Sequence, residues 1–283
     1  MHKIIQKKPL GQDIYLLEFE AADIALAAGA GQFVMLRIDE NGERFPLTLY
    51  DFDKTRGTVS VVCQAVGKST RKLCSLNAGD AVRDMAGPLG HAVETRLIGK
   101  IIIIGGGVGT AEAFPIARAM QRSGNDVTVI IGARSRNLVI SEQEMRAFCS
   151  KVIVVTDDGS CGRKGLVTDV LRELMDSERY DLVYAIGPAI MMKKVSEMTL
   201  PRAVKTMVSL NSIMIDGTGM CGGCRIIYGG KSRFVCVDGP EFDGHKVDFD
   251  DMMRRGAQYR RQEKQSLESY EHQCRISGQQ ETK

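Results

Sequence analysis

The first 96 residues contain short runs of β-branched and aromatic residues, and turn-forming segments separate these runs. Asn41-Gly42, Arg56-Gly57 and Ala78-Gly79-Asp80 are examples of the separating turns. Strands this short and this regularly interrupted are typical of an antiparallel barrel or sandwich. We therefore predict an N-terminal antiparallel β-barrel domain over residues 1–96. Its expected strands include residues 14–19, 33–38, 45–50 and 58–64.

From residue 97 onward, longer apolar runs alternate with stretches of helical periodicity. Residues 101–104 are four consecutive isoleucines, as expected of a strand that is covered on both faces. Alternating strands and helices predict an α/β doubly wound parallel sheet over residues 97–210. The further strands are expected at 127–131, 152–155, 182–186 and 206–210, and the helices at 111–122, 166–175 and 189–198.

The last part of the chain differs from both of these patterns. Residues 211–250 are rich in glycine, which predicts a small loop-rich module rather than a packed helix or sheet. Residues 251–283 are polar and helix-prone, and we expect a helix that becomes a frayed tail beyond about residue 267.

Composition excludes several classes of protein. The net charge of +3 is too small and too dispersed to indicate a nucleic-acid partner. No run reaches the ~18 apolar residues of a membrane span, and the N-terminus lacks the apolar core of a secretory signal. We therefore expect a cytoplasmic protein with no membrane partner. In that compartment thiols stay reduced, so clustered cysteines indicate metal binding more often than disulfides.

A glycine-rich segment directly follows the isoleucine strand and directly precedes a helical stretch. Glycines there permit a tight turn and a close approach of the backbone to a pyrophosphate, which the helix N-terminus also attracts. The second strand ends at Arg134 with no carboxylate for a ribose hydroxyl, and Arg134 and Arg136 are either ligands of a 2′-phosphate or ordinary loop charges. The choice between NADH and NADPH stays open. The candidate residues of the segment are Gly105, Gly107, Val108, Gly109 and Thr110.

Three cysteines near the C-terminus have the spacing of a metal site. Asp216, Cys221, Cys224 and Cys236 give D-x4-C-x2-C-x11-C, which differs from the plant-type [2Fe–2S] pattern by an aspartate in the first position. Three cysteines and an aspartate also suit zinc, but zinc sites usually pair two short knuckles and only one is present. The fourth ligand is either Asp216 or a remote cysteine, for which Cys161 and Cys274 are the candidates.

A second phosphate cradle is indicated in the N-terminal domain. Gly67, Lys68, Ser69 and Thr70 combine a glycine, two hydroxyls and a cation at the start of an expected helix. Two such cradles in two domains suggest two bound dinucleotides.

Taken together, these motifs resemble the ferredoxin–NADP reductase superfamily, in which a β-barrel FAD domain precedes a nucleotide domain. Within it the chain is similar to the branch of the dihydroorotate dehydrogenase electron-transfer subunits. The Asp216-headed motif and Thr156-Asp157-Asp158-Gly159-Ser160 resemble more narrowly the small subunits of NADH-dependent reduced ferredoxin:NADP oxidoreductase, also called sulfide dehydrogenase. Arg44 departs from the usual R-x-Y-[ST] flavin motif, because it lies four residues before Thr48.

The resemblance implies an FAD, one [2Fe–2S] cluster and NAD(H) or NADP(H) as cofactors. It places Thr48 and Leu49 at the isoalloxazine ring, residues 67–70 at the FAD pyrophosphate, and Gly187 and Pro188 near the nicotinamide. It also implies hydride transfer between nicotinamide and flavin, for which no catalytic acid or base is obligatory, and single-electron transfer between flavin and cluster.

By the same resemblance, the chain works with a larger flavin and iron–sulfur subunit and reaches ferredoxin through that complex. Three alternatives remain open: an electron-transfer subunit of dihydroorotate dehydrogenase, a stand-alone sulfide or polysulfide reductase, and a non-catalytic redox sensor.

Overall fold

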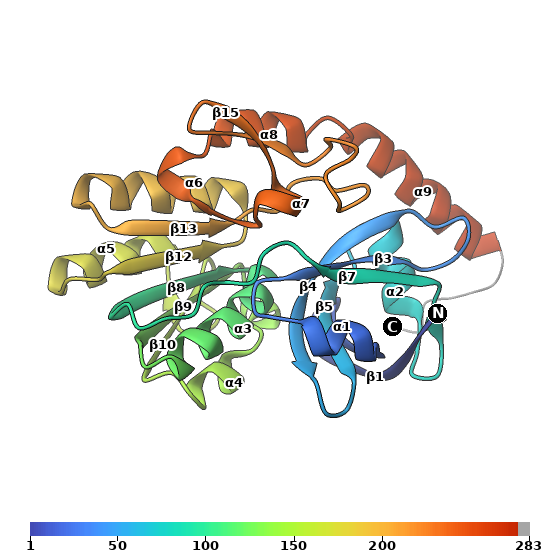
Figure 1. Ribbon diagram of the computed structural model, residues 1–283, viewed down its shortest axis with the longest axis horizontal. Coiled ribbons are helices and arrows are strands. Elements are labelled where there is room, and N and C mark those ends of the chain that lie inside the picture. Colours follow the sequence, from blue (N-terminus) through green and yellow to red (C-terminus); the bar gives the residue numbers. More distant parts are fainter. Residues whose placement is uncertain (277–283) are drawn as a thin grey trace.

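A computed structural model describes residues 1–276 of the chain. Its N-terminal part is an antiparallel sheet in the order β6-β1-β2-β5-β4-β3-β7, and only Arg83 separates the two edge strands β6 and β7. The sheet therefore curls into a nearly closed barrel, as predicted (Figure 1). The strands are β1 (His2–Gly11), β2 (Ile14–Glu20), β3 (Phe33–Arg37), β4 (Arg44–Asp53), β5 (Thr58–Gln64), β6 (Ala81–Val82) and β7 (Asp84–Leu89), with helices α1 (Ala22–Ala27) and α2 (Lys68–Ser75).

The second part is the expected α/β sheet, in the order β11-β10-β9-β8-β12-β13-β16. All pairs are parallel except β13 with β16. The sheet is doubly wound, because α3 and α4 pack on one face and α5 and α6 on the other (Figure 1). Its strands are β8 (Lys100–Gly106), β9 (Asp126–Ala133), β10 (Lys151–Thr156), β11 (Arg163–Lys164), β12 (Leu182–Ile186), β13 (Lys205–Ser209) and β16 (Glu241–Asp243). Its helices are α3 (Gly109–Arg122), α4 (Glu142–Arg146), α5 (Val167–Ser177) and α6 (Ala189–Thr199), with short 3-10 turns at Arg136–Leu138 and Leu200–Arg202.

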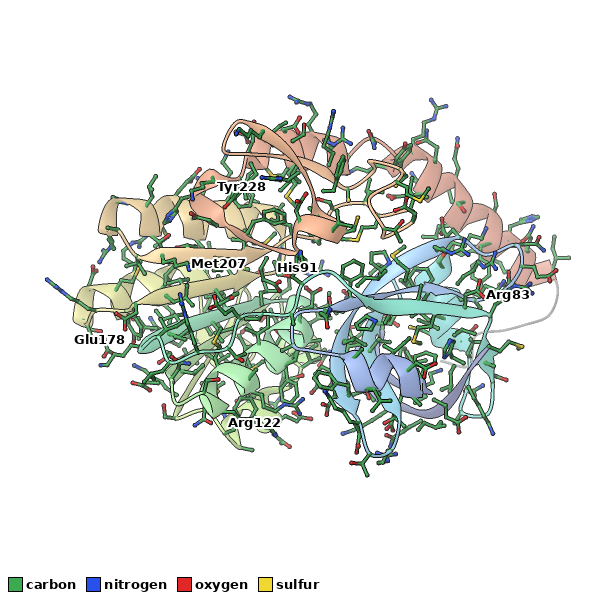
Figure 2. The ribbon with its side chains drawn as sticks, viewed as in Figure 1. Arg83, His91, Arg122, Glu178, Met207 and Tyr228 are labelled. Carbon is green, nitrogen blue, oxygen red and sulfur yellow. The ribbon has the colours of Figure 1, made fainter. Side chains whose placement is uncertain are left out.

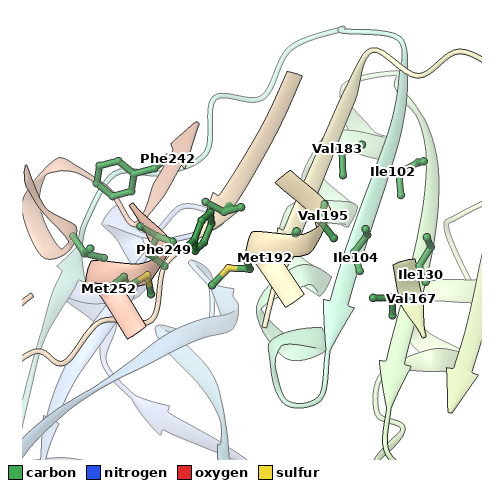
Figure 3. Close-up of a cluster of buried hydrophobic side chains, with 14 of the residues drawn as sticks. Ile102, Ile104, Ile130, Val167, Val183, Met192, Val195, Phe242, Phe249 and Met252 are labelled. Carbon is green, nitrogen blue, oxygen red and sulfur yellow. The ribbon is translucent and has the colours of Figure 1, made fainter. Parts of the chain in front are cut away.

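The four isoleucines of β8 explain why this sheet has two cores. Successive side chains of a strand point to opposite faces, so Ile101 and Ile103 join one hydrophobic cluster while Ile102 and Ile104 join the other. All four are fully buried. Figure 3 shows that the second of these cores continues from Ile102 and Ile104 past Met192 of α6 to Phe249 and Met252, so it also supports the C-terminal module.

The C-terminal module lies over the junction between barrel and sheet (Figure 1). Its strand β16 pairs with β13, so part of the segment 211–250 is built into the α/β sheet. Figure 2 locates this junction through His91, whose backbone N–H donates to Gly239 O, while Arg83 lies at the outer end of the barrel. The module consists of β14 (Arg225–Tyr228), β15 (Lys231–Phe234), α7 (Val235–Asp238), a 3-10 turn at Gly244–Lys246, α8 (Phe249–Gly256) and α9 (Arg260–Ile276).

We expected a frayed tail beyond about residue 267, and this prediction is wrong as far as Ile276. Helix α9 continues to that residue. Lys264–Glu268 and Glu271–Arg275 ion pairs stabilise successive turns, and Glu271 also forms an ion pair with Arg71 of α2. Contact with the barrel therefore orders a helix whose sequence alone looks too polar to pack. The rest of the predicted tail lies outside the described residues.

Candidate functional site

A cavity of about 620 Å³ lies at the carboxyl ends of the parallel strands. Gly106 and Gly107 at the end of β8, Arg134 after β9, Asp157 after β10 and Pro188 after β12 all contribute to its wall. Ligands of doubly wound sheets bind at this edge, in the crevice where the strand order reverses. Here the strand order reverses at β8: β9, β10 and β11 follow on one side of it, and β12 and β13 lie on the other side.

The glycine-rich segment divides into residues that face this cavity and residues that support it. Gly107, Val108 and Gly109 line the cavity, whereas Gly105 and Thr110 pack against each other behind the turn. Gly107 has a φ of +59°, and a Cβ on it would meet no atom within 4 Å. A Cβ on Gly109 would lie 2.6 Å from the carbonyl oxygen of Ile186, so the close approach of the α3 N-terminus to β12 requires glycine there. The turn is thus shaped to present backbone N–H groups to an anion.

A second cavity of about 250 Å³ lies between β4 of the barrel and the start of α3. Thr48, Thr70 and Pro46 line its barrel side, and Ser212 and Met214 of the C-terminal module close it. The two cavities share five lining residues, so ligands in them would be in contact. The shared residues are Gln64, Val108, Glu112, Ser209 and Asn211.

Alternation along β4 places Pro46 and Thr48, which both line the second cavity, on one strand face. Leu47 and Leu49 lie on the other face and pack with the barrel core; Leu47 also contributes to the cavity wall, whereas Leu49 is fully buried and does not. The backbone N–H of Leu49 donates to Gln32 O at 2.9 Å. Arg44, which departs from the flavin motif in spacing, precedes Pro46 and Thr48 by two and four residues and therefore shares their strand face.

The start of α2 borders both the second cavity and a third one of about 310 Å³. Thr70 lines the second cavity, and its hydroxyl oxygen accepts a hydrogen bond from the backbone N–H of Gly67 at 2.9 Å. Lys68 and Ser69 line the third cavity together with Tyr270 of α9. Residues 67–70 therefore lie between two hollows, as expected of a cradle for the middle of an elongated ligand.

Glu112 is a site residue that the sequence analysis missed. It lies in the first turn of α3 and lines both of the first two cavities. Burial raises the pKa of its carboxyl group to about 7, and a hydrogen bond from the Thr48 hydroxyl lowers it by less. The available signal was a lone acidic residue two positions after the glycine-rich turn, in an otherwise apolar helix start.

The four candidate cluster ligands form two pairs. The Sγ atoms of Cys224 and Cys236 lie 3.2 Å apart in a buried position. The Cys221 thiol hydrogen-bonds the Asp216 carboxylate, which also accepts the backbone N–H of Cys221 at 2.7 Å. These backbone and side-chain hydrogen bonds lower the pKa of Asp216, with the N–H of Thr218 contributing most. Among the residues that the structure describes, no group of three or more His, Cys, Asp or Glu side chains meets around a single point.

Backbone amides of the same loop point at the sulfurs, as a cluster requires. The Gly223 N–H donates to Cys221 Sγ at 3.4 Å and the Cys236 N–H to Cys224 Sγ at 3.5 Å. Gly217 shapes the start of the loop, with a φ of +76° and space for no Cβ, which would lie 2.5 Å from Met35 Cγ. The donor set and the loop therefore fit an iron–sulfur cluster.

The remote cysteines lie elsewhere in the fold. Cys161 packs against the hydrophobic core on the face of the sheet opposite to Cys224 and Cys236. Cys274 lies on α9, the helix that packs against α2 of the barrel.

These sites define the class of the protein: an oxidoreductase of the ferredoxin–NADP reductase fold, with two adjoining cavities and a small iron–sulfur-binding module. A family model described as "Iron-sulfur cluster binding domain of dihydroorotate dehydrogenase B" matches residues 211–248, and "Oxidoreductase NAD-binding domain" matches residues 103–197. The chain belongs to the family of dihydroorotate dehydrogenase B electron-transfer subunits and their homologues, and it is an electron-transfer subunit with NAD-binding and iron–sulfur-binding domains.

Individual relatives support this assignment. The chain is 42% identical over 270 residues to the "Dihydroorotate dehydrogenase B (NAD(+)), electron transfer subunit homolog" of Thermotoga maritima, with 95% of each chain covered. It is 32% identical over 253 residues to the electron transfer subunit of Desulforamulus reducens, covering 87% of this chain and 96% of the relative.

A solved structure described as "Insights into flavin-based electron bifurcation via the NADH-dependent reduced ferredoxin-NADP oxidoreductase structure" also matches. Its TM-score is 0.90 at 40% identity, and the match covers 95% of this chain and 98% of that chain. The resemblance stated from the sequence is confirmed. None of the described helices is long and apolar enough to cross a membrane.

Proposed function

We propose that this chain binds FAD in the second cavity, NAD(H) or NADP(H) in the first, and one [2Fe–2S] cluster in the loop headed by Asp216. In this arrangement a hydride moves between nicotinamide and flavin, and single electrons move between flavin and cluster. The single observation that carries the proposal is the set of five residues shared by the two cavities, since hydride transfer requires direct contact of the two rings.

The residues around the cavities support specific roles. The N–H groups of Val108 and Gly109 at the α3 N-terminus would hold the nucleotide phosphates, with Gly187 and Pro188 at the nicotinamide end. Thr48 and Thr70 would contact the flavin, and Lys68 and Ser69 the part of FAD that extends toward the third cavity. Arg134 is available to a 2′-phosphate, and Asp157 on the same wall is available to ribose hydroxyls.

The pairing of the cluster ligands favours [2Fe–2S] over zinc. Each iron of such a cluster takes two protein ligands, whereas a structural zinc needs four ligands around one ion. Asp216 with Cys221 and Cys224 with Cys236 give two ligands for each of two irons. The position of Cys161 behind the sheet also supports Asp216, rather than Cys161, as the fourth ligand.

The cluster loop borders the second cavity, which gives electrons a short exit. Ser212 and Met214 line that cavity and directly precede the Asp216 motif. Met220, in the middle of the motif, is 88% exposed, so the outer side of the loop is open to a partner. We propose a larger flavin- and iron–sulfur-containing subunit as that partner, with ferredoxin reached through the complex and the chain located in the cytoplasm.

The test is purification under anaerobic conditions from the native source, followed by analysis of cofactors and of the co-purifying chain. We expect about one FAD, two irons and two acid-labile sulfides per chain, and reduction of the flavin by NADH or NADPH. Zinc in place of iron would contradict the cluster assignment. The names of the curated relatives favour a second candidate, the electron-transfer subunit of a dihydroorotate dehydrogenase, which predicts a co-purifying dihydroorotate-oxidising chain instead.

A further inference from the structure

Two half-buried acidic residues lie beside the second cavity, and the carboxyl group of neither is needed for hydride transfer. The first is Glu112, whose carboxyl group accepts a hydrogen bond from Thr48 between the two cavities. It is the only residue lining the second cavity, among those that the structure describes, whose side chain is an ordinary acid or base.

The second carboxyl group belongs to Glu241 on β16. Its Oε1 atom is buried and has no hydrogen-bond partner among the described residues. It faces the barrel at Gly31, where a Cβ would lie 2.7 Å from Oε1. Burial raises the pKa of Glu241 to about 8, and the charge of Glu112 raises it as well, so the two groups interact electrostatically. Neighbours of Glu241 on both sides, Pro240 and its strand partner Ser209, line the second cavity.

The proposed electron transfer leaves a proton at this position. Oxidation of NADH to NAD⁺ delivers two electrons and one proton to the flavin site as a hydride. A [2Fe–2S] cluster accepts electrons one at a time and carries no proton, so two electrons leave through it and one proton remains for each NADH oxidised. The proton has to leave a cavity that the barrel, α3 and the C-terminal module enclose.

We propose that Glu112 accepts this proton at its carboxylate and that Glu241 takes it next, toward the barrel loop at Gly31. In the opposite direction of electron flow the same two groups deliver the proton. The inference rests on the proposed function, and it makes Glu112 a catalytic residue for the proton that accompanies electron exit, not for the hydride step.

The surrounding charged groups do not offer a competing route. Arg134, Asp157 and Lys194 lie on the wall of the first cavity and are absent from the second. Asp51 of β4 is held by Arg118, further along α3. On the far side, Tyr184 interacts electrostatically with Glu241 and with Glu94, and burial raises the pKa of the Tyr184 hydroxyl above its ordinary value, which keeps it protonated.

The test compares Glu112→Gln, which keeps a hydrogen-bond acceptor for Thr48 but binds no proton, with Glu112→Asp, which still titrates. Anaerobic stopped-flow measurements separate flavin reduction by NADH from electron exit through the cluster. We expect electron exit to slow at least ~100-fold more than flavin reduction does in Glu112→Gln, with partial recovery of electron exit in Glu112→Asp. Glu144→Gln on the exposed side of α4 is the control for loss of a negative charge.

A second readout does not depend on turnover. Infrared difference spectra of the wild-type holoprotein, recorded as the flavin is reduced and reoxidised, should contain a carboxyl band that Glu112→Gln removes. Equal electron-exit rates in wild type and Glu112→Gln, equal slowing in the Gln and Asp variants, or no such band in the wild type would each overturn the proposal. Failure of both NADH and NADPH to reduce the flavin of the wild type would instead overturn the proposed function.

Discussion

The ring of Tyr50 on β4 stacks on the ring of Phe114 on α3, with centroids 4.6 Å apart and planes 12° from parallel. Arg118 adds a contact over the Phe114 ring and an ion pair to Asp51. Tyr50 belongs to the barrel and Phe114 to the α/β domain, and Glu112, which lines the second cavity, precedes Phe114 by two residues on α3. This stack is therefore one of the contacts that align the barrel with the α/β domain beside the two cavities.

We predict that Tyr50 and Phe114 are energetically coupled. In a double-mutant cycle with Tyr50→Leu and Phe114→Leu, the coupling energy should be about 0.5–1.5 kcal/mol, as for other stacked aromatic pairs. Urea unfolding of the holoprotein measures this energy. In both single variants the rate of hydride transfer from NADH should fall by a larger factor than the affinity for FAD, because the two domains lose their alignment. Additive single variants would show that other contacts hold the domains together.

The nucleotide cavity offers a sharper test at Gly107. A carboxylate in Gly107→Asp would point into open space where phosphates are expected, and aspartate tolerates the positive φ of this position better than most residues. We predict that the Kd for NADH rises ~100-fold, while FAD and the cluster stay bound. Gly107→Asn has the same shape without the charge, so it should weaken binding much less. Equal Kd values for the two variants would show that no phosphate lies near residue 107.

The comparison with Gly109 shows what the glycine motif alone did not reveal. The sequence treats 105–110 as one anion-binding segment, but only part of it faces the cavity. Gly109 is glycine because β12 lies against it, a contact made by residues far along the chain. Substitution there should unfold the turn rather than block the nucleotide. Sequence spacing predicts the motif, and tertiary contact assigns the roles of its members.

The same distinction explains which elements were predictable. The buried strands of the α/β sheet were evident because each is covered on both faces, so its run is uniformly apolar. Strand β1 was not, because it is largely polar and Ile4 is its one buried side chain. It forms by pairing with β2. Glu241 was equally hidden, since its burial depends on β16 joining β13 across a long loop.

Glu241 makes the stability of the folded protein depend on pH. Its pKa is about 8 in the folded chain against 4.5 for an exposed glutamate, so the folded state binds more protons between these values. The contribution of Glu241 to the free energy of unfolding is therefore largest below pH 4.5, and it is lost as the pH rises from 4.5 through 8. We predict that Glu241→Gln loses less stability than wild type between pH 5.5 and 8.5, by on the order of 2 kcal/mol.

Apparent Tm values of the anaerobic holoprotein at a fixed scan rate measure this effect. A difference of roughly 5 °C between the two proteins is expected at pH 8.5, and a smaller one at pH 5.5. Glu20→Gln, which removes an exposed carboxylate from the barrel, should follow the wild-type curve. If the plots of Tm against pH for wild type and Glu241→Gln are parallel, folding does not raise the pKa of Glu241.

The pairing of Asp216 with Cys221 leads to the last prediction. An aspartate that merely starts a turn would keep its bonds to the N–H groups of Thr218 and Cys221 and would not touch the cluster. An aspartate that binds iron alters the electron density of that iron, because a carboxylate oxygen replaces a thiolate. Asp216→Cys should therefore retain the cluster and shift both its reduction potential and its EPR g-values.

Two further variants separate these cases. Asp216→Ala should lose most of the iron, since one iron would keep a single protein ligand, while Cys161→Ser should leave iron content and spectrum unchanged. Because Asp216→Ala also removes the turn, Asp216→Asn serves as the matched variant: its single side-chain oxygen still accepts the N–H of Thr218, which starts the turn, but is a poor ligand for iron. Full iron content and an unaltered spectrum in Asp216→Asn would show that the carboxylate shapes the loop and that another residue completes the cluster.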